Sequence, residues 1–230
     1  MQPNLQTTPQ LTSTGGLTQN RVLRNTYALL GVTMIPTVIG AFIGTNLSFS
    51  FMRASPIMSS LILLAMLYGM MFAIEKNKNS SVGVYLLLGF TLFMGIILGP
   101  LLQVALSFRN GAQLIAVAGG GTGITFLALA AFSATTKRDL SGMSRFLFVG
   151  AIVLMIAVVA NIFLQMPALQ LALSAAFILF SSLIIAYTIN SIVHGGETNY
   201  ISATLSIYIS IYNIFSNLLN LLLVLTGNRN

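Results

Sequence analysis

The chain of 230 residues contains no cysteine and no tryptophan, and its charged side chains are scarce. Without cysteine it can form no disulfide, no thiolate metal site and no cysteine nucleophile. Asp, Glu, Lys and Arg make up 6% of the residues, whereas a soluble domain carries about 25%. Hydrophobic residues make up 56%, and so few charges cannot cover the surface of a water-soluble globule of this size. The composition predicts an integral membrane protein.

The charge that is present does not indicate a nucleic-acid partner. The formal net charge is +7, but the basic residues are scattered between apolar stretches, as is typical of the flanks of membrane helices. Residues 1–20 are polar and uncharged, without the basic start and apolar run of a cleavable signal peptide. We expect residues 1–20 to form a flexible cytoplasmic tail and residues 21–230 to form one transmembrane domain.

Seven stretches are long and apolar enough to cross a membrane, which takes about 20 residues at 1.5 Å per residue. Uninterrupted apolar runs such as residues 152–156 lack the alternation of a membrane β-strand, so the fold class is all-α. The expected spans are about 26–45, 57–74, 82–104, 112–134, 146–165, 168–190 and 201–226. None contains a charged residue, consistent with the cost of placing a charge at a helix centre.

The distribution of Lys and Arg predicts the orientation, because basic residues favour the cytoplasmic side. An inner N-terminus places seven of them inside, namely Arg21, Arg24, Lys76, Lys78, Lys137, Arg138 and Arg145. Three lie outside, namely Arg53, Arg109 and Arg229. With seven crossings, the C-terminus is then expected outside.

The last span carries a polar stripe on one face. Five residues recur at spacings of four, three, four and three, namely Ser206, Ser210, Asn213, Asn217 and Asn220. Such spacing places them along one side of a helix. The preceding span has a weaker counterpart in Ser174, Ser181 and Thr188. Polar residues dictate helix packing in lipid, so we expect this last helix at the centre of the bundle.

Two interpretations of the stripe remain open. It can serve as interhelical hydrogen bonding, or it can line a hydrated or ion-conducting path between the last two helices. Elsewhere, the glycine-rich run 119–123 lacks the Lys of a phosphate loop and is expected to allow close helix packing. Pro36 and Gly99-Pro100 are expected to kink their helices.

The most distinctive loop contains His194, Gly195, Gly196, Glu197 and Tyr200. One His and one Glu are too few ligands for a zinc site, so we expect a turn in which the glycines adopt unusual dihedrals. Thr198 or Asn199 would then cap the last helix. No span holds a carboxylate, histidine or cysteine, so we expect no enzyme activity, no metal and no cofactor.

Four segments resemble the Bax inhibitor-1 family, and most closely its bacterial YccA-type branch. They are residues 22–27 (VLRNTY), 159–169 (VANIFLQMPAL), 194–200 (HGGETNY) and 208–215 (YISIYNIF). The resemblance covers nearly the whole chain from about residue 20. It implies a seven-helix fold with the last helix central, which agrees with the polar stripe.

The resemblance also implies two activities. Members of the YccA-type branch bind the membrane protease FtsH in the bacterial inner membrane and restrain its proteolysis of membrane proteins. Other members leak calcium through a path gated by two carboxylates, whose positions match Thr188 and Ser210. The resemblance therefore implies FtsH as the partner, whereas the calcium leak is weakened because neither residue can titrate near neutral pH. A calcium or cation leak along the stripe is the alternative.

Overall fold

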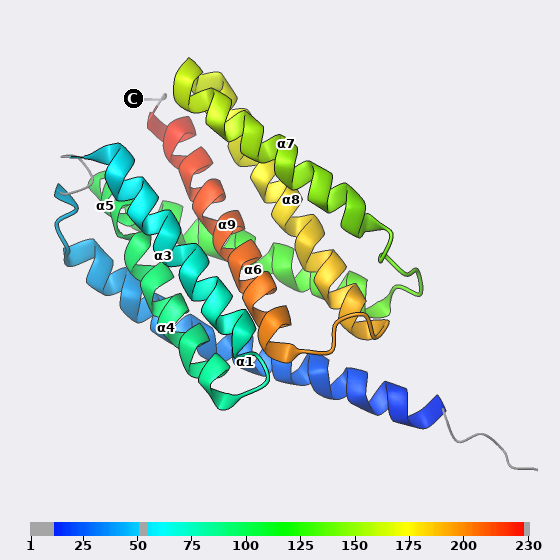
Figure 1. The fold of residues 1–230 in the computed structure, drawn as a ribbon. Helices are drawn as coiled ribbons and strands as arrows, with labels where there is room; N and C mark the ends of the chain where they lie inside the picture. The colour runs from blue at the N-terminus through cyan, green and yellow to red at the C-terminus, as the bar shows by residue number, and fades with distance from the viewer. Residues whose placement is uncertain (1–11, 51–54, 228–230) are drawn as a thin grey trace, which may run out of the picture.

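The computed structural model describes residues 12–50 and 55–227, except for the side chains of residues 12–16, 56 and 57. This part of the chain is helical and contains no strand (Figure 1). The helices are α1 (Thr12–Asn46), α3 (Pro56–Lys76), α4 (Ser81–Ile97), α5 (Gly99–Ser107), α6 (Gly111–Thr135), α7 (Met143–Leu164), α8 (Pro167–Val193) and α9 (Tyr200–Gly227). With α4 and α5 counted as one span, seven helices are long and apolar enough to cross a membrane. The predicted all-α membrane fold with seven spans is confirmed.

The largest departure from the expected boundaries is at α1, which begins at Thr12 instead of about residue 26. The other six spans agree with the expected boundaries to within three residues at each end. Residues 12–25 are too polar to show an apolar period, but extending an existing helix is far easier than nucleating one. Val22 anchors the added turns by packing against Ile192 and Ala203. Residues 12–20, expected in the flexible tail, are therefore helical, and residues 1–11, like Arg53 and Arg229, lie outside the described residues.

Pro100 and Pro167 lie at helix boundaries, and the expected kink at Gly99-Pro100 takes the form of a helix break. Leu98 interrupts the third span and separates α4 from α5, with Pro100 in the first turn of α5. Pro167 likewise occupies the first turn of α8, where its missing N–H costs no hydrogen bond. Gln165 ends α7 in the left-handed conformation at φ 48°, so α7 and α8 form a tight hairpin. The kink expected at Pro36 does not break α1, which continues through it.

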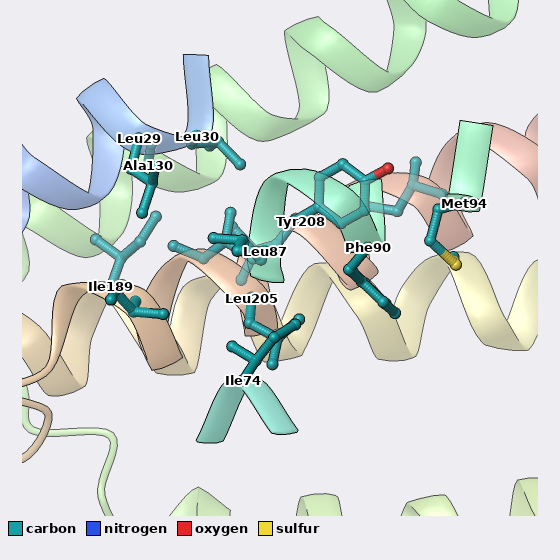
Figure 2. Packing of buried hydrophobic residues seen from close by; sticks show 14 residues of the cluster. Leu29, Leu30, Ile74, Leu87, Phe90, Met94, Ala130, Ile189, Leu205 and Tyr208 are labelled. Carbon is teal, nitrogen blue, oxygen red and sulfur yellow. The ribbon is translucent and has the colours of Figure 1, made fainter. Parts of the chain in front are cut away.

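Helix α9 is the central element of the bundle. It packs against α1, α3, α4, α5, α6 and α8, whereas α7 packs only against α8 within the described part of the chain. The largest apolar cluster joins residues of α1, α3, α4, α6, α8 and α9, with Tyr208 among the most buried side chains (Figure 2). Burial around α9 fits the predicted central position of the last span.

The loops define two ends of the bundle. Loops 77–80, 136–142 and 194–199 lie at one end with the start of α1, which we name the basic end (Figure 1). Loops 108–110 and 165–166 lie at the other, which we name the hairpin end. The names follow from the basic residues, because Lys78, Lys137 and Arg138 all belong to loops of the first end.

Candidate functional site

The two polar stripes meet along the seam between α8 and α9. Near the basic end, the Oγ1 of Thr188 lies 3.2 Å from the Oγ of Ser206 and shares a hydrogen bond with it. Nearer the hairpin end, the Nδ2 of Asn220 donates to the Oγ of Ser174 at 3.2 Å. Ser181, the middle member of the α8 stripe, is buried. The seam is therefore a line of neutral hydroxyl and amide groups between two helices.

Thr188 and Ser210, which we expected to match the family's carboxylate positions, do not hydrogen-bond to each other. Thr188 is paired with Ser206, and the hydroxyl of Ser210 donates to the backbone oxygen of Ser206 at 2.9 Å. Both Thr188 and Ser210 are buried. Because Ser210 lies one turn beyond Ser206 on α9, the two positions still belong to one stretch of the seam.

Toward the hairpin end the seam widens into a polar hollow between α7, α8 and α9. The hollow encloses about 490 Å³. Its polar lining comes from Asn161, Gln165, Gln170, Ser174, Asn217 and Asn220. The Oδ1 of Asn161 is buried and has no hydrogen-bond partner among the described residues. A buried amide oxygen without a partner is costly in an apolar surrounding, so this hollow favours water or another hydrogen-bond donor.

The loop 194–199 closes α8 with a Schellman motif, which explains the glycine at position 195. Gly195 has φ +78°, the left-handed region that a side chain rarely adopts. Its N–H donates to the oxygen of Ile192 at 3.1 Å, and the N–H of Gly196 donates to the oxygen of Ser191 at 2.7 Å. The expected turn with unusual dihedrals is present at Gly195.

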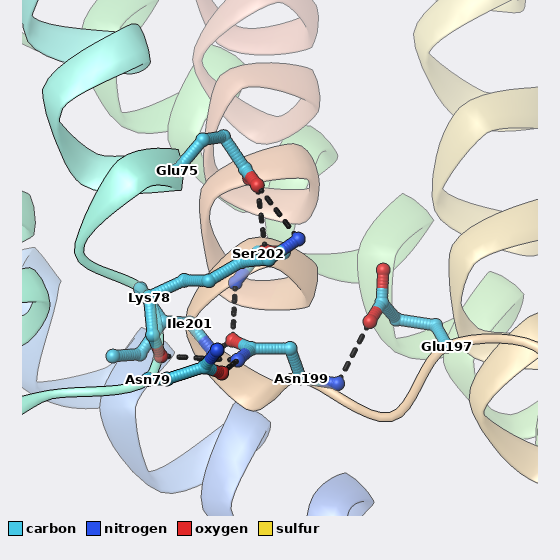
Figure 3. Close-up of polar contacts among 7 residues, drawn as sticks. All are labelled: Glu75, Lys78, Asn79, Glu197, Asn199, Ile201 and Ser202. Atoms are coloured by element: carbon cyan, nitrogen blue, oxygen red, sulfur yellow. Dashed lines mark hydrogen bonds and ion pairs between the residues drawn. The ribbon is translucent and has the colours of Figure 1, made fainter.

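The same loop begins α9 and binds it to the loop between α3 and α4 (Figure 3). Asn199, rather than Thr198, caps α9, because its Oδ1 accepts from the N–H groups of Ile201 and Ser202 at 2.9 and 3.2 Å. Its Nδ2 donates to the backbone oxygen of Lys78 and to the side chain of Asn79. Glu197 accepts from the N–H of Asn199 at 2.7 Å. One asparagine thus holds two loops and a helix start together.

A carboxylate completes this network. The Oε2 of Glu75 accepts from the hydroxyl of Ser202 at 3.0 Å and lies 3.1 Å from the Nζ of Lys78 (Figure 3). Tyr200, the last residue of the family-motif loop, packs against the apolar clusters beside α1. The motif loop therefore has a clear structural role at the basic end.

Asn190 fixes the remaining loop of the basic end. Its side chain is fully buried, accepts from the N–H of Leu140 at 2.8 Å and donates to the oxygen of Arg138 at 3.0 Å. The backbone oxygen of Asn190 is 2.9 Å from the Nδ1 of His194. The sequence reasoning missed Asn190, although a lone asparagine near the end of an apolar span is a usable signal for a buried hydrogen-bonding role.

The glycine-rich run in α6 does not pack as expected. A Cβ added to Gly119, Gly120 or Gly123 would meet no atom within 4 Å, and only Gly121 approaches a neighbour, the Cδ2 of Leu218 at 3.0 Å. The expectation of close helix packing is therefore wrong for three of these glycines. Gly119, Gly120 and Gly123 are exposed, whereas Gly121 and the buried Thr122 face the bundle.

Close packing occurs instead between α1 and the α4–α5 span. An added Cβ at Gly40, Gly44, Gly95 or Gly99 would collide with the backbone of the facing helix. Each pair has the four-residue spacing that lets two membrane helices approach closely. That spacing is visible in the sequence, and it is the signal from which the close approach of these two helices could have been predicted.

Comparison with known proteins defines the class of this fold. Residues 19–229 match the family model described as inhibitor of apoptosis-promoting Bax1. The chain belongs to this family, the Bax inhibitor-1 family, as its motifs indicated.

Individual relatives narrow the assignment to the YccA-type branch. The chain is 46% identical over 206 residues to a protein of Escherichia coli named modulator of FtsH protease YccA, covering 90% of this chain and 91% of the relative. It is also 46% identical to an uncharacterized protein of Neisseria meningitidis, covering 92% and 94%. A Campylobacter jejuni protein is 32% identical and covers 87% of each chain.

Proposed function

We propose that this chain is a multi-pass inner-membrane protein, without enzyme activity of its own, that binds the membrane protease FtsH and restrains its proteolysis of membrane proteins. The observation that carries the proposal is the 46% identity, over 90% of the chain, to a relative named modulator of FtsH protease. In the proposed orientation the N-terminus and the basic end face the cytoplasm, because most Lys and Arg lie there.

The shape of α1 supports contact with a cytoplasmic machine. The helix has 35 residues, whereas about 20 suffice to cross the hydrocarbon core. Its first turns project past the other helices of the basic end (Figure 1), and Leu17 is 71% exposed. Residues 1–11 precede this projection in the sequence, and we propose that an ATP-driven protease grips this N-terminal segment.

The test is co-purification from native membranes. The tagged protein is solubilised in mild detergent and purified. The amount of FtsH that it recovers is compared with the amount recovered by an unrelated seven-helix protein produced at the same level. The proposal predicts FtsH in the eluate at a level well above that control. Recovery equal to the control, after mild cross-linking as well as without it, counts against the proposal.

A cation path along the α8–α9 seam is the second candidate function. The hollow with the unpartnered Asn161 Oδ1 favours it, because neutral oxygen atoms near a membrane surface attract water and weakly bound cations. Thr188, Ser206 and Ser210 supply no carboxylate in the narrower part of the seam. This ranks the cation path below the FtsH partnership.

A further inference from the structure

An apolar groove runs between α1 and α6, with α9 as its floor. It encloses about 970 Å³, and the rings of Tyr27 on α1 and Phe126 on α6 meet edge to face across it, with centroids 6.2 Å apart. One wall is a face of α1 within residues 27–41, and the other is a face of α6 within residues 115–134. Fifteen residues of α1 correspond to a length of about 21 Å, so the groove extends through much of the hydrocarbon core.

The lining favours a hydrocarbon occupant. Its surface is almost entirely apolar, and the hydroxyls of Thr37, Thr122 and Tyr208 along it are already hydrogen-bonded. The hydroxyl of Tyr208 lies 2.9 Å from the Oγ1 of Thr37, and Thr122 donates to the oxygen of Ala118 at 2.7 Å. An added Cβ at Gly31, Gly119 or Gly123 would meet nothing within 4 Å. The walls therefore leave room for a chain that needs no hydrogen bonds.

Three cations flank the groove at the basic end. Arg24 lies seven residues before Gly31, two helical turns away and close to the same stripe of α1. Lys137 and Arg138 lie two and three residues after the end of α6 at Thr135. All three are exposed, and none forms an ion pair within the described residues.

The loop that carries two of these cations is held in place. Asn190 binds the backbone oxygen of Arg138, as described above. The neighbouring Asp139 turns its carboxylate toward the N–H and hydroxyl of Ser141, at 2.8 and 3.0 Å. Positive charge thus prevails beside the opening of a long apolar groove.

From this juxtaposition we infer that the groove between α1 and α6 binds an anionic phospholipid. One acyl chain lies along the open glycines of the two walls, and the phosphate lies near Arg24, Lys137 and Arg138. Charge complementarity selects this occupant, because a hydrophobic helix of a protein partner gains nothing from three cations at the membrane surface, whereas an anionic headgroup does. The inference does not depend on the partnership with FtsH.

The absence of tryptophan allows a direct test. Leu127 lines the groove and is 65% exposed, whereas Leu179 is 68% exposed on α8 outside it. Leu127→Trp and Leu179→Trp are reconstituted separately, and fluorescence quenching by brominated phosphatidylglycerol is compared with quenching by brominated phosphatidylcholine. We expect about fivefold preference for phosphatidylglycerol at position 127, because one basic residue near the surface contributes about that factor. No preference is expected at position 179.

Two sets of matched variants refine the result. In the Leu127→Trp background, replacing Arg24, Lys137 and Arg138 by Gln should abolish the preference, whereas Arg145→Gln should leave it unchanged. Gly119→Leu with Gly123→Leu should reduce quenching by both lipids, whereas Gly120→Leu, equally open but outside the groove lining, should not. Circular dichroism and monodisperse elution establish that each variant is folded. If a Leu variant does not fold, the Gln variants alone test the inference.

Three results would overturn the inference. Equal quenching by the two lipids at position 127 indicates ordinary boundary lipid. A preference that survives loss of the three cations indicates another headgroup site. Weak quenching by both lipids, together with a disulfide-linked dimer through Leu127→Cys, indicates that a second copy of the chain occupies the groove.

Discussion

Gly44 of α1 and Gly99 at the start of α5 meet backbone to backbone. A Cβ added to Gly99 would fall closer than van der Waals contact to the oxygen, carbon and Cα of Gly44. One helical turn earlier on each helix, Gly40 and Gly95 approach the facing backbones in the same way. The crossing requires glycine because only a residue without a Cβ fits.

Gly44→Ala should therefore destabilise the bundle by about 1–3 kcal/mol, the usual cost of overpacking. Gly69→Ala on α3 is the matched control, because an added Cβ there meets nothing within 4 Å and Ala favours the helix. Thermal unfolding in detergent should show a lower apparent Tm for the first variant only. Equal Tm values for both would contradict the packing described.

These glycines show how far the sequence predicts the fold. Apolar length alone located the seven spans, because lipid forces every backbone polar group into a helix. It could not show which glycines face a helix and which face lipid, since both environments are apolar. The run 119–123 and the pair Gly40 and Gly44 therefore look alike in sequence and differ in structure.

The seam between α8 and α9 was also only partly predictable. Helical spacing placed Ser206, Ser210 and the three asparagines on one side of a helix. It could not reveal the hollow around Asn161, because that space depends on how α7 and α8 leave their shared hairpin. The start of α1 at Thr12 was unpredictable for a different reason, since its first turns lie beyond the apolar span.

Asn190→Leu should loosen the loop 136–142. The change leaves the N–H of Leu140 and the oxygen of Arg138 without their partner, and the loss of one such hydrogen bond typically costs about 0.5–1.5 kcal/mol. Limited trypsin digestion in detergent should then cut faster at Lys137 and Arg138. Cleavage at Arg109, at the opposite end, serves as the internal reference. An unchanged ratio of the two cleavage rates would show that Asn190 does not hold the loop.

Asp139 should titrate below the ordinary range of an aspartate, about 3.9. The N–H of Ser141, followed by its hydroxyl, stabilises the carboxylate and lowers the pKa of Asp139. Because the folded-state pKa is lowered, the turn is stabilised above the unfolded pKa and loses that stabilisation as pH falls through the folded pKa.

Carbon-13 NMR of the Asp139 carboxylate in micelles measures this shift. In Ser141→Ala the pKa should rise but remain below the ordinary value, because the backbone N–H, the larger cause, is retained. A pKa that does not respond to Ser141→Ala would exclude the hydroxyl as a contributor.

The natural seam should not support pH-gated calcium flux. Thr188 and Ser210 have nothing to titrate between pH 6 and 8, so liposomes with the natural chain should show little flux and no sharp pH dependence. Thr188→Asp together with Ser210→Asp should introduce a coupled pair with at least one raised pKa. That variant should gain a pH-dependent change that neither single variant shows. Robust pH-gated flux from the natural chain would favour the cation path over the FtsH partnership.

Deleting residues 2–11 should leave the fold intact, because the anchoring contacts of α1 begin near Val22. It should slow the chain's own degradation by FtsH, since the protease then lacks a segment to grip. Pulse-chase half-lives in cells with active FtsH, compared with cells that lack it, provide the measurement. A half-life equal to that of the full chain would remove the N-terminal segment from the mechanism.

The most direct test of the central claim uses purified components in one membrane. FtsH is reconstituted with a membrane-protein substrate, and the rate of substrate degradation is measured with increasing amounts of this chain. The account predicts that degradation slows progressively as the chain approaches and exceeds the amount of FtsH, while an unrelated seven-helix protein has no effect. A degradation rate that stays constant at a several-fold excess of this chain would contradict it.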